Sequence, residues 1–113
     1  MKGERLGEFE ELVLLTLAGM KDKDSYVVPI LERLEDEAER IVPIGAVYSA
    51  LDRLHRKGMV RSWVAGGEKR GEGRRKRYYA VNEDGRAALD ESRRIREHLW
   101  QTMLRATPEG SPA

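Results

Sequence analysis

The sequence has no cysteine, few aromatic residues and no long apolar run. Without cysteine, the 113-residue chain has no disulfide, thiolate zinc site, iron–sulfur cluster or cysteine nucleophile. Its longest apolar stretch runs from Leu12 to Ala18, interrupted by Thr16, and is far shorter than the roughly 20 residues of a membrane helix. We therefore expect a single small cytoplasmic domain with no membrane segment.

Signatures of catalysis and of cofactor binding are also missing. The two histidines, His55 and His98, are far apart and lack the spacing of metal ligands. The glycine-rich segment 66–73 lacks the lysine of a phosphate-binding loop and the third glycine of a dinucleotide fingerprint, and it precedes a strand pattern. No serine stands near a base in a recognisable arrangement. We therefore expect a protein that is not an enzyme and binds no cofactor or metal.

Net charge is nearly absent, at +1, but the charged residues are unevenly distributed. Residues 1–42 carry 6 basic and 11 acidic side chains, for a net charge of −5. Residues 43–81 carry 10 basic and 3 acidic side chains (+7), and residues 82–113 carry 5 and 6 (−1). A cationic block between acidic or neutral flanks indicates a polyanionic partner, such as double-stranded DNA.

The spacing of apolar residues predicts two helices in the first 42 residues. The first runs from Gly7 to Ala18, with glutamates at its start, where the helix dipole favours them, and Gly19 at its end. Asp24 or Ser25 can cap the second helix. The apolar stripe of the second helix consists of Val27, Ile30, Leu31, Leu34, Ala38 and Ile41.

A third helix follows Pro43 and ends before Gly58, because glycine favours the conformation that closes a helix. Its apolar stripe includes Tyr48, which would either lie in the core or reach a phosphate from the rim with its hydroxyl. The stripe consists of Ile44, Val47, Tyr48, Leu51 and Leu54. The outward face has small residues that allow close approach to a major groove, with basic residues further on. The residues expected there are Gly45, Ala46, Ser49, Ala50, Arg53 and Arg56, of which Ser49, Arg53 and Arg56 are candidate DNA contacts.

The pattern then changes to the period of two that is typical of strands. Residues 59–65 and 75–81 predict the two strands of a β-hairpin, joined by a glycine-rich, charged loop that we expect to be mobile. Asn82 can cap a last helix from Glu83 to about Arg105, which would be about 34 Å long. Residues 107–113 should form a flexible tail.

The order of these elements predicts a mainly α protein with a small β-hairpin. Three helices followed by a hairpin with a basic loop describe a winged helix-turn-helix domain, which we assign to residues 1–81. Residues 82–106 would form a long C-terminal dimerisation helix, followed by the tail. In such a fold the third helix is the candidate recognition element and the hairpin is the wing.

The predicted wing is the strongest indication of a nucleic-acid partner. Its cations, surrounded by glycines, would attract DNA phosphates without distinguishing sequence. The alternative is a solvated hairpin tip whose charge only aids solubility, but a helix-turn-helix directly upstream favours DNA. The six cations are Lys69, Arg70, Arg74, Arg75, Lys76 and Arg77.

The apolar stripe of the last helix indicates a partner, because so small a body cannot bury a helix of this length. The simplest partner is a second copy related by a two-fold axis, and this homodimer would present its recognition helices about one DNA turn apart. Trp100 would either pack in the seam between the copies or line an aromatic cleft for a small flat ligand. The dimerisation stripe consists of Leu89, Ile95, Leu99 and Met103.

Three segments of the chain resemble the PadR family of transcriptional regulators. They are residues 6–15, residues 44–60 around the third helix and residues 73–89, which include the Arg-Lys-Arg-Tyr-Tyr strand. The resemblance implies a bacterial homodimeric repressor that binds palindromic operators and, in some members, is released by phenolic or drug-like molecules. The short chain resembles the branch of the family with a single C-terminal helix.

The resemblance also implies roles for particular residues. The helix from Asn82 would be the dimerisation helix. One departure is Val27 after Tyr26, where the family usually has a glycine. The implied DNA contacts are Tyr48, Ser49, Arg53 and the wing residues Arg74 to Arg77.

Two other functions remain as alternatives to DNA binding. A winged-helix protein-interaction module would use the wing on an acidic partner and would show no preference for any duplex. An RNA-binding module would need an exposed aromatic platform, whereas Tyr78 and Tyr79 should alternate between the two faces of their strand. We therefore favour a homodimeric DNA-binding repressor.

Overall fold

The structure is a computed structural model that describes residues 5–67 and 73–106. Three helices come first, α1 (Glu8–Ala18), α2 (Val27–Glu37) and α3 (Ile44–Arg56), with a short 3₁₀ helix, η1 (Asp22–Asp24), between the first two. An antiparallel hairpin of β1 (Val60–Ala65) and β2 (Lys76–Val81) follows, and then helix α4 (Glu83–Arg105). The predicted fold class, a mainly α winged helix-turn-helix with a long last helix, is confirmed.

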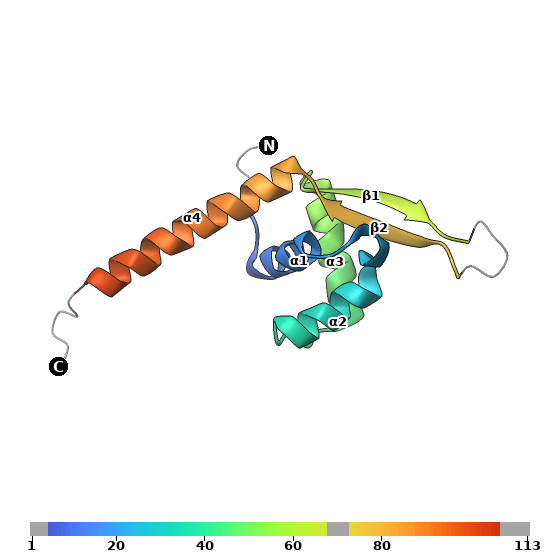
Figure 1. The fold of residues 1–113 in the computed structure, drawn as a ribbon, viewed down its shortest axis with the longest axis horizontal. Coiled ribbons are helices and arrows are strands. Elements are labelled where there is room, and N and C mark those ends of the chain that lie inside the picture. Colours follow the sequence, from blue (N-terminus) through green and yellow to red (C-terminus); the bar gives the residue numbers. More distant parts are fainter. Residues whose placement is uncertain (1–4, 68–72, 107–113) are drawn as a thin grey trace.

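Helices α1, α2 and α3 gather into one body, from which the hairpin extends on one side and α4 on the other (Figure 1). The molecule is elongated as a result, with extents of 69 × 31 × 21 Å. The core lies where α1 packs against α2, α3 and the hairpin. The apolar side chains with no exposed surface are Val13, Leu14, Ile30, Leu34, Val47, Ala50, Leu51 and Leu54.

Helix α2 is shorter than predicted and starts without the predicted cap. It ends at Glu37, and Glu39 adopts a left-handed conformation (φ 54°), so the chain turns away before Ile41. Ile41 is 86% exposed, and the prediction that places it on the buried stripe is wrong. At the other end, the Ser25 hydroxyl donates to the carbonyl oxygen of Asp22 (2.9 Å) and closes η1, while α2 receives no side-chain cap.

Helix α3 ends as predicted, with Gly58 in the left-handed conformation (φ 76°) just beyond it. Its outward face differs from the prediction, because Ala50 is fully buried. Its apolar stripe differs too, because Ile44 is 42% exposed and Tyr48 is 53% exposed. Ile44 lies one turn before Val47, the first buried residue of the helix, so the first turn of α3 extends beyond the core.

The hairpin follows the predicted strands to within one residue, and its register places Trp63 opposite Tyr78. The amide of Tyr79 donates a hydrogen bond to the carbonyl oxygen of Ser25 (2.9 Å), which ties β2 to the segment that leads into α2. Tyr79 is buried and Tyr78 is half-buried, so the two tyrosines alternate between faces as predicted.

Helix α4 has the predicted bounds and the predicted cap. The Oδ1 atom of Asn82 accepts from the amide of Gly85 (2.8 Å), and Nδ2 of Asn82 donates to the carbonyl oxygen of Gly58 (2.8 Å). Gly85 lies against the carbonyl oxygen of Met59, where a Cβ atom would have no room. Leu89 is 6% exposed and belongs to the core of its own chain, so its assignment to a dimer interface is wrong. The sequence pattern could not show that the first turns of α4 pack on the body and that only the rest of the helix extends away from it.

Candidate nucleic-acid interface

The exposed face of α3 carries three of the predicted DNA contacts. Tyr48 and Ser49 are exposed in the middle of the helix. Arg56, in the last turn, pairs with Asp52 one turn earlier (Nη2 to Oδ2, 3.1 Å), and both side chains are mostly exposed. Because an ion pair this exposed contributes little to stability, the Arg56 guanidinium can exchange Asp52 for another anion at small cost.

Arg53 turns toward α1, which the sequence did not predict. Its Nε donates to Oε2 of Glu10 (2.8 Å), while 43% of the Arg53 side chain stays exposed. Lys57 donates through Nζ to Oε1 of the same carboxylate (2.7 Å) and to the carbonyl oxygen of Arg5 (2.7 Å). Glu10 therefore holds the C-terminal end of α3 against the start of α1.

The buried carboxylate of Glu10 is charged because of these contacts. Burial by itself would raise its pKa, but hydrogen bonds from Lys57, the Gly7 amide and Arg53 outweigh burial and lower the pKa to about 2. The sequence contains one signal for this site. Glu10 is spaced like the core residues that follow it, three before Val13 and seven before Leu17, so it lies on the buried face of α1.

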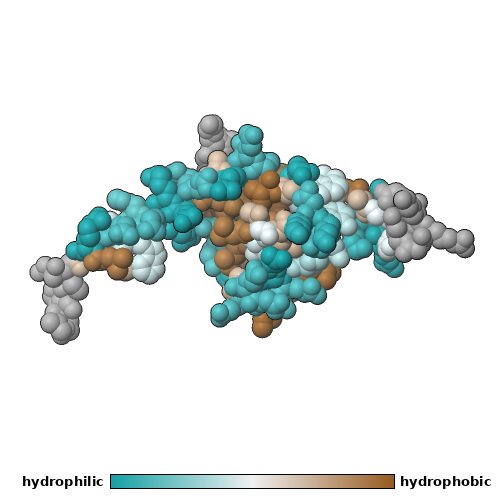
Figure 2. Space-filling view, viewed as in Figure 1, coloured by the Kyte–Doolittle hydropathy of each residue, from teal (hydrophilic) through white to brown (hydrophobic). Residues whose placement is uncertain are grey.

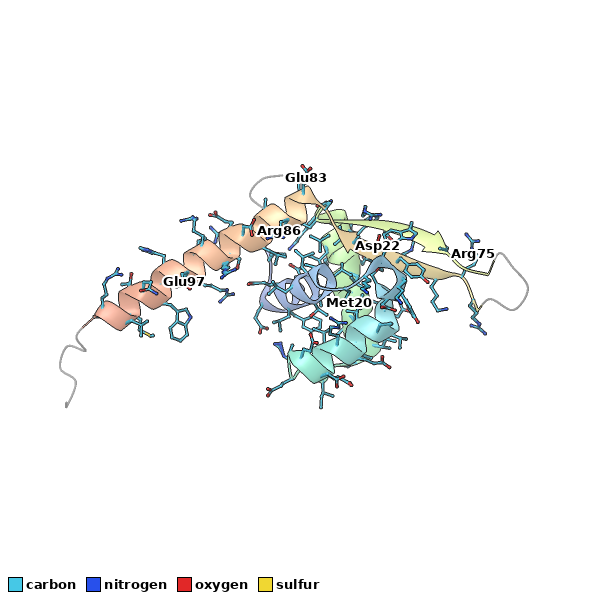
Figure 3. All side chains as sticks on the ribbon, in the orientation of Figure 1. Met20, Asp22, Arg75, Glu83, Arg86 and Glu97 are labelled. Atoms are coloured by element: carbon cyan, nitrogen blue, oxygen red, sulfur yellow. The ribbon has the colours of Figure 1, made fainter. Side chains whose placement is uncertain are left out.

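The described part of the wing presents three exposed arginines. Arg74, Arg75 and Arg77 are exposed, and Nη1 of Arg77 donates to the Ser62 hydroxyl across the hairpin (3.1 Å). Arg75 lies toward the outer end of the hairpin (Figure 3). Lys76 differs, because it is half-buried and its Nζ lies 5.2 Å from the centre of the Tyr26 ring. Two further predicted cations, Lys69 and Arg70, lie outside the described residues.

An aromatic cluster joins the wing to the start of α2. Trp63 and Tyr78 stack across the hairpin, with ring centres 5.7 Å apart, and Tyr26 meets the edge of Tyr78 at 5.5 Å. Arg61 covers the Trp63 ring from 4.6 Å. These contacts fix the base of the wing relative to the helix-turn-helix. The sequence analysis missed the cluster, although the alternation along the two strands already pairs residues of this kind.

The outer part of α4 has a row of exposed apolar side chains. Figure 2 shows an apolar patch on its lower side, away from the body. Nearer the body, Arg96 pairs with Glu11 of α1 (3.1 Å), beside a groove of about 950 Å³ whose lining includes Leu6, Met59 and Ile95. The exposed apolar residues are Ile95 (38%), Leu99 (60%), Trp100 (59%), Met103 (53%) and Leu104 (65%). Three of the four predicted dimerisation residues thus lie on an uncovered face.

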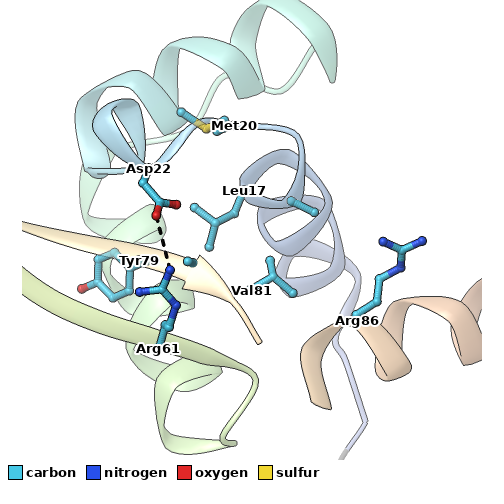
Figure 4. A pocket seen from close by; sticks show the side chains of 9 residues that line it. Leu17, Met20, Asp22, Arg61, Tyr79, Val81 and Arg86 are labelled. Carbon is cyan, nitrogen blue, oxygen red and sulfur yellow. Dashed lines mark hydrogen bonds and ion pairs between the residues drawn. The ribbon is translucent and has the colours of Figure 1, made fainter. Parts of the chain in front are cut away.

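A smaller hollow of about 280 Å³ lies between α1, the hairpin and the start of α4 (Figure 4). Leu17, Met20 and Val81 line it together with an ion pair between Asp22 and Arg61 (3.3 Å). Within residues 5–67 and 73–106, no group of three histidine or acidic side chains could hold a metal ion. No helix in the same ranges is long and apolar enough to cross a membrane.

A helix-turn-helix whose second helix has one exposed face, followed by a hairpin with exposed arginines, defines a winged-helix DNA-binding protein. The model of the transcriptional regulator PadR-like family matches residues 14–91. The chain belongs to the PadR-like family and is a transcriptional regulator rather than an enzyme. The family resemblance of the sequence is thereby confirmed.

Solved structures of the family share the fold. A PadR family regulator from Clostridium difficile R20291 is 20% identical with a TM-score of 0.68, covering 84% of this chain and 94% of its own. A PadR-like transcription factor from Bacteroides fragilis is 25% identical with a TM-score of 0.67, covering 84% and 85%. A PadR family regulator from Eggerthella lenta DSM 2243 is 20% identical with a TM-score of 0.68, covering 88% and 83%. None of the curated proteins matches the chain.

Proposed function

We propose that the protein is a homodimeric repressor that binds a palindromic operator in double-stranded DNA. The observation that carries this proposal is the set of exposed arginines Arg74, Arg75 and Arg77 on the hairpin that directly follows α3 and its exposed face. Cations on a wing suit phosphates, and an exposed second helix of a helix-turn-helix suits the major groove. Both features occur in a chain of the PadR-like family.

Helix α3 and the wing contribute to DNA binding in different ways. Tyr48 and Ser49 of α3 face base edges or the sugar–phosphate rim, and Arg56 reaches a phosphate at the other end of the helix. The wing arginines supply most of the affinity through phosphates, with Lys69, Arg70 and Lys76 adding to the same field. Arg53 serves mainly to hold α3 against α1, because its Nε is engaged by Glu10.

The dimer forms through the outer part of α4. Ile95, Leu99, Met103 and Leu104 expose a continuous apolar row that is costly in water and is covered by the same row of a second copy. The groove between α1 and α4 offers the partner helix further apolar surface. Two bodies related in this way present their α3 helices to half-sites about one DNA turn apart.

A small aromatic ligand would act at the same interface. Trp100 is 59% exposed and lies next to Leu99 on α4, so two copies bring two indole rings near the two-fold axis. A flat ligand between these rings would change how the two copies pack and thereby the spacing of their recognition helices. The alternative is that Trp100 only packs in the seam.

Selection of bound fragments from the source genome tests the proposal. The expected result is enrichment of fragments that contain a palindrome with half-site centres about 10 base pairs apart. A reporter gene placed behind such a fragment should be less active when the protein is present. The absence of enrichment over competitor DNA would contradict the proposal and favour a protein-interaction module, and increased reporter activity would contradict repression.

A further inference from the structure

One exposed isoleucine lies just before α3 and another is its first residue, in a part of the chain without charge. Residues 41–51 contain no charged side chain, although 36% of the sequence is charged. Within this segment Ile41 is 86% exposed and Ile44 is 42% exposed. Neither contributes to the core, and large exposed apolar side chains that cluster usually mark a contact surface.

Their position indicates what they contact. Ile44 is the first residue of α3, and in helix-turn-helix proteins the N-terminal residues of the second helix contact base edges in the major groove. Tyr48 follows one turn later on the same side and is also exposed. Around Gly45 there is open space, since a Cβ atom there would meet nothing within 4 Å. A surface can therefore approach the backbone of this turn closely.

We propose that Ile44 packs against the C5-methyl group of a thymine in each operator half-site and is a specificity-determining residue. The inference rests on the proposed DNA-binding function and adds the base that α3 selects. The thymine methyl is the apolar group on the base edges of the major groove, so an aliphatic side chain can distinguish thymine by contact alone. Ile41, three residues earlier, extends the apolar surface.

The absence of charge in this segment supports a base rather than the DNA backbone as the partner. Phosphates are contacted by cations and by hydrogen-bond donors, and the isoleucine side chain provides neither. Along α3 the exposed arginines lie at the C-terminal end, and the wing carries others. The uncharged first turn of α3 is thus suited to the base edges of the major groove. The cations on the wing and at the C-terminal end of α3 are suited to the phosphates that border the groove.

Replacing thymine by uracil removes only the methyl group and tests the contact directly. Operator duplexes from the genomic selection are made with each thymine in turn replaced by deoxyuridine, and Kd is measured by fluorescence anisotropy at one salt concentration. With the unchanged protein, replacement at one position of the half-site should weaken binding about fourfold per methyl group. With Ile44→Ser, the same replacement should have no effect, because the side chain that contacts the methyl is gone.

Two variants serve as controls. Ile44→Val keeps a branched aliphatic side chain and should keep the preference for thymine over uracil. Leu15→Ser removes an apolar side chain of similar exposure (50%) on α1 and should also keep it. Since Ile44 and Leu15 are both well exposed, both serine variants should melt near the temperature of the unchanged protein.

The possible outcomes separate this inference from the proposed function. Tight binding to the selected operator with no response to uracil, or with a response that Ile44→Ser leaves intact, overturns the inference and leaves the DNA-binding function standing. If Ile44→Ser changes the oligomeric state while the response to uracil persists, this face covers another copy of the chain, and the inference is overturned. If no duplex is selected at all, the proposed function fails and the inference fails with it.

Discussion

The carboxylate of Glu10 lies 2.8 Å from Nε of Arg53, although the two residues are 43 positions apart in the sequence. The pair joins the first turn of α1 to the last turn of α3, and Lys57 completes it from 2.7 Å. Because Glu10 is only 5% exposed, its charge is stabilised by these partners rather than by water. The orientation of the proposed recognition helix therefore depends on an ionised side chain that belongs to another helix, α1.

We predict that the protein loses stability when this carboxylate is protonated. The pKa of Glu10 is about 2 in the folded chain, below the ordinary 4.5, so the unfolded chain binds the proton more readily. The contribution of Glu10 is fully present above pH 4.5 and is lost as the pH falls through 2. A shift of this size corresponds to about 3 kcal/mol in the free energy of unfolding, as an upper limit. Urea unfolding at a series of pH values between 6 and about 2 measures it.

A pair of variants separates Glu10 from the other carboxyl groups. Glu10→Gln should be less stable at pH 7 and should lose much of the pH dependence below 5. Glu8→Gln is the matched control, because Glu8 lies in the same turn but is 66% exposed, and its pair with Arg40 contributes little. A Glu10→Gln protein whose stability falls with acid as steeply as that of the unchanged protein would show that other groups are responsible.

The second prediction concerns the wing. Replacing Arg74, Arg75 and Arg77 together by alanine should weaken binding to all duplexes to a similar degree, because phosphate contacts carry no sequence information. For the unchanged protein as the proposed dimer, a plot of log affinity against log salt should have a slope of about −5 to −7, if each half-site makes three or four phosphate contacts. The triple variant should bring this slope much closer to zero. Anisotropy titrations at several salt concentrations measure both effects.

Two comparisons show whether the loss is specific to the wing. Arg93→Ala removes an exposed arginine on α4 and should leave affinity and slope nearly unchanged. Ser49→Ala should instead alter the preference among related operators with little change in the salt slope. If Ser49→Ala and the triple arginine variant behave alike, the division between base contacts by α3 and phosphate contacts by the wing is incorrect.

The third prediction distinguishes the two parts of α4. Leu99→Glu places a charge in the exposed apolar row and should give a folded monomer with weakened DNA binding, as judged by sedimentation at micromolar concentration. Leu89→Ala, only ten residues earlier, should instead lower the free energy of unfolding by about 2–5 kcal/mol, because it leaves a cavity in the core of each chain. A dimer that survives Leu99→Glu would mean that another surface joins the copies.

The fourth prediction concerns Trp100. In a Trp63→Phe background its fluorescence reports on the α4 interface alone, because the sequence has two tryptophans. Titration with planar phenols and cationic dyes should quench or shift this emission, and ligands that do so should weaken operator binding. If no ligand of a broad panel changes the Trp100 emission, a packing role for the indole is favoured.

Local signals predicted the elements well, and contacts between distant elements explain what they missed. The Asn82 cap and the closing Gly58 are features of a few adjacent residues, and both were predicted correctly. Whether Ile44 is exposed or Leu89 is buried depends instead on where the covering elements end, which apolar spacing does not encode. Arg53 has the right residue type for a phosphate, but its direction is set by Glu10 on another helix. Burial and ion pairing are thus the parts of the site that required the structure.

Because Leu89 is anchored in the core, α4 is held in a fixed orientation relative to the body. With its base fixed by Leu89 and Gly85, the outer apolar row of α4 keeps a set angle to α3 of the same chain. Each residue of a helix contributes about 100° of rotation and 1.5 Å of length. In the proposed dimer, the number of residues between Leu89 and Leu99 would then set the distance between the two recognition helices and their rotation relative to each other. Inserting one residue there would rotate the two DNA-binding bodies so that both could no longer face their half-sites at once. No side chain proposed to contact DNA would be changed.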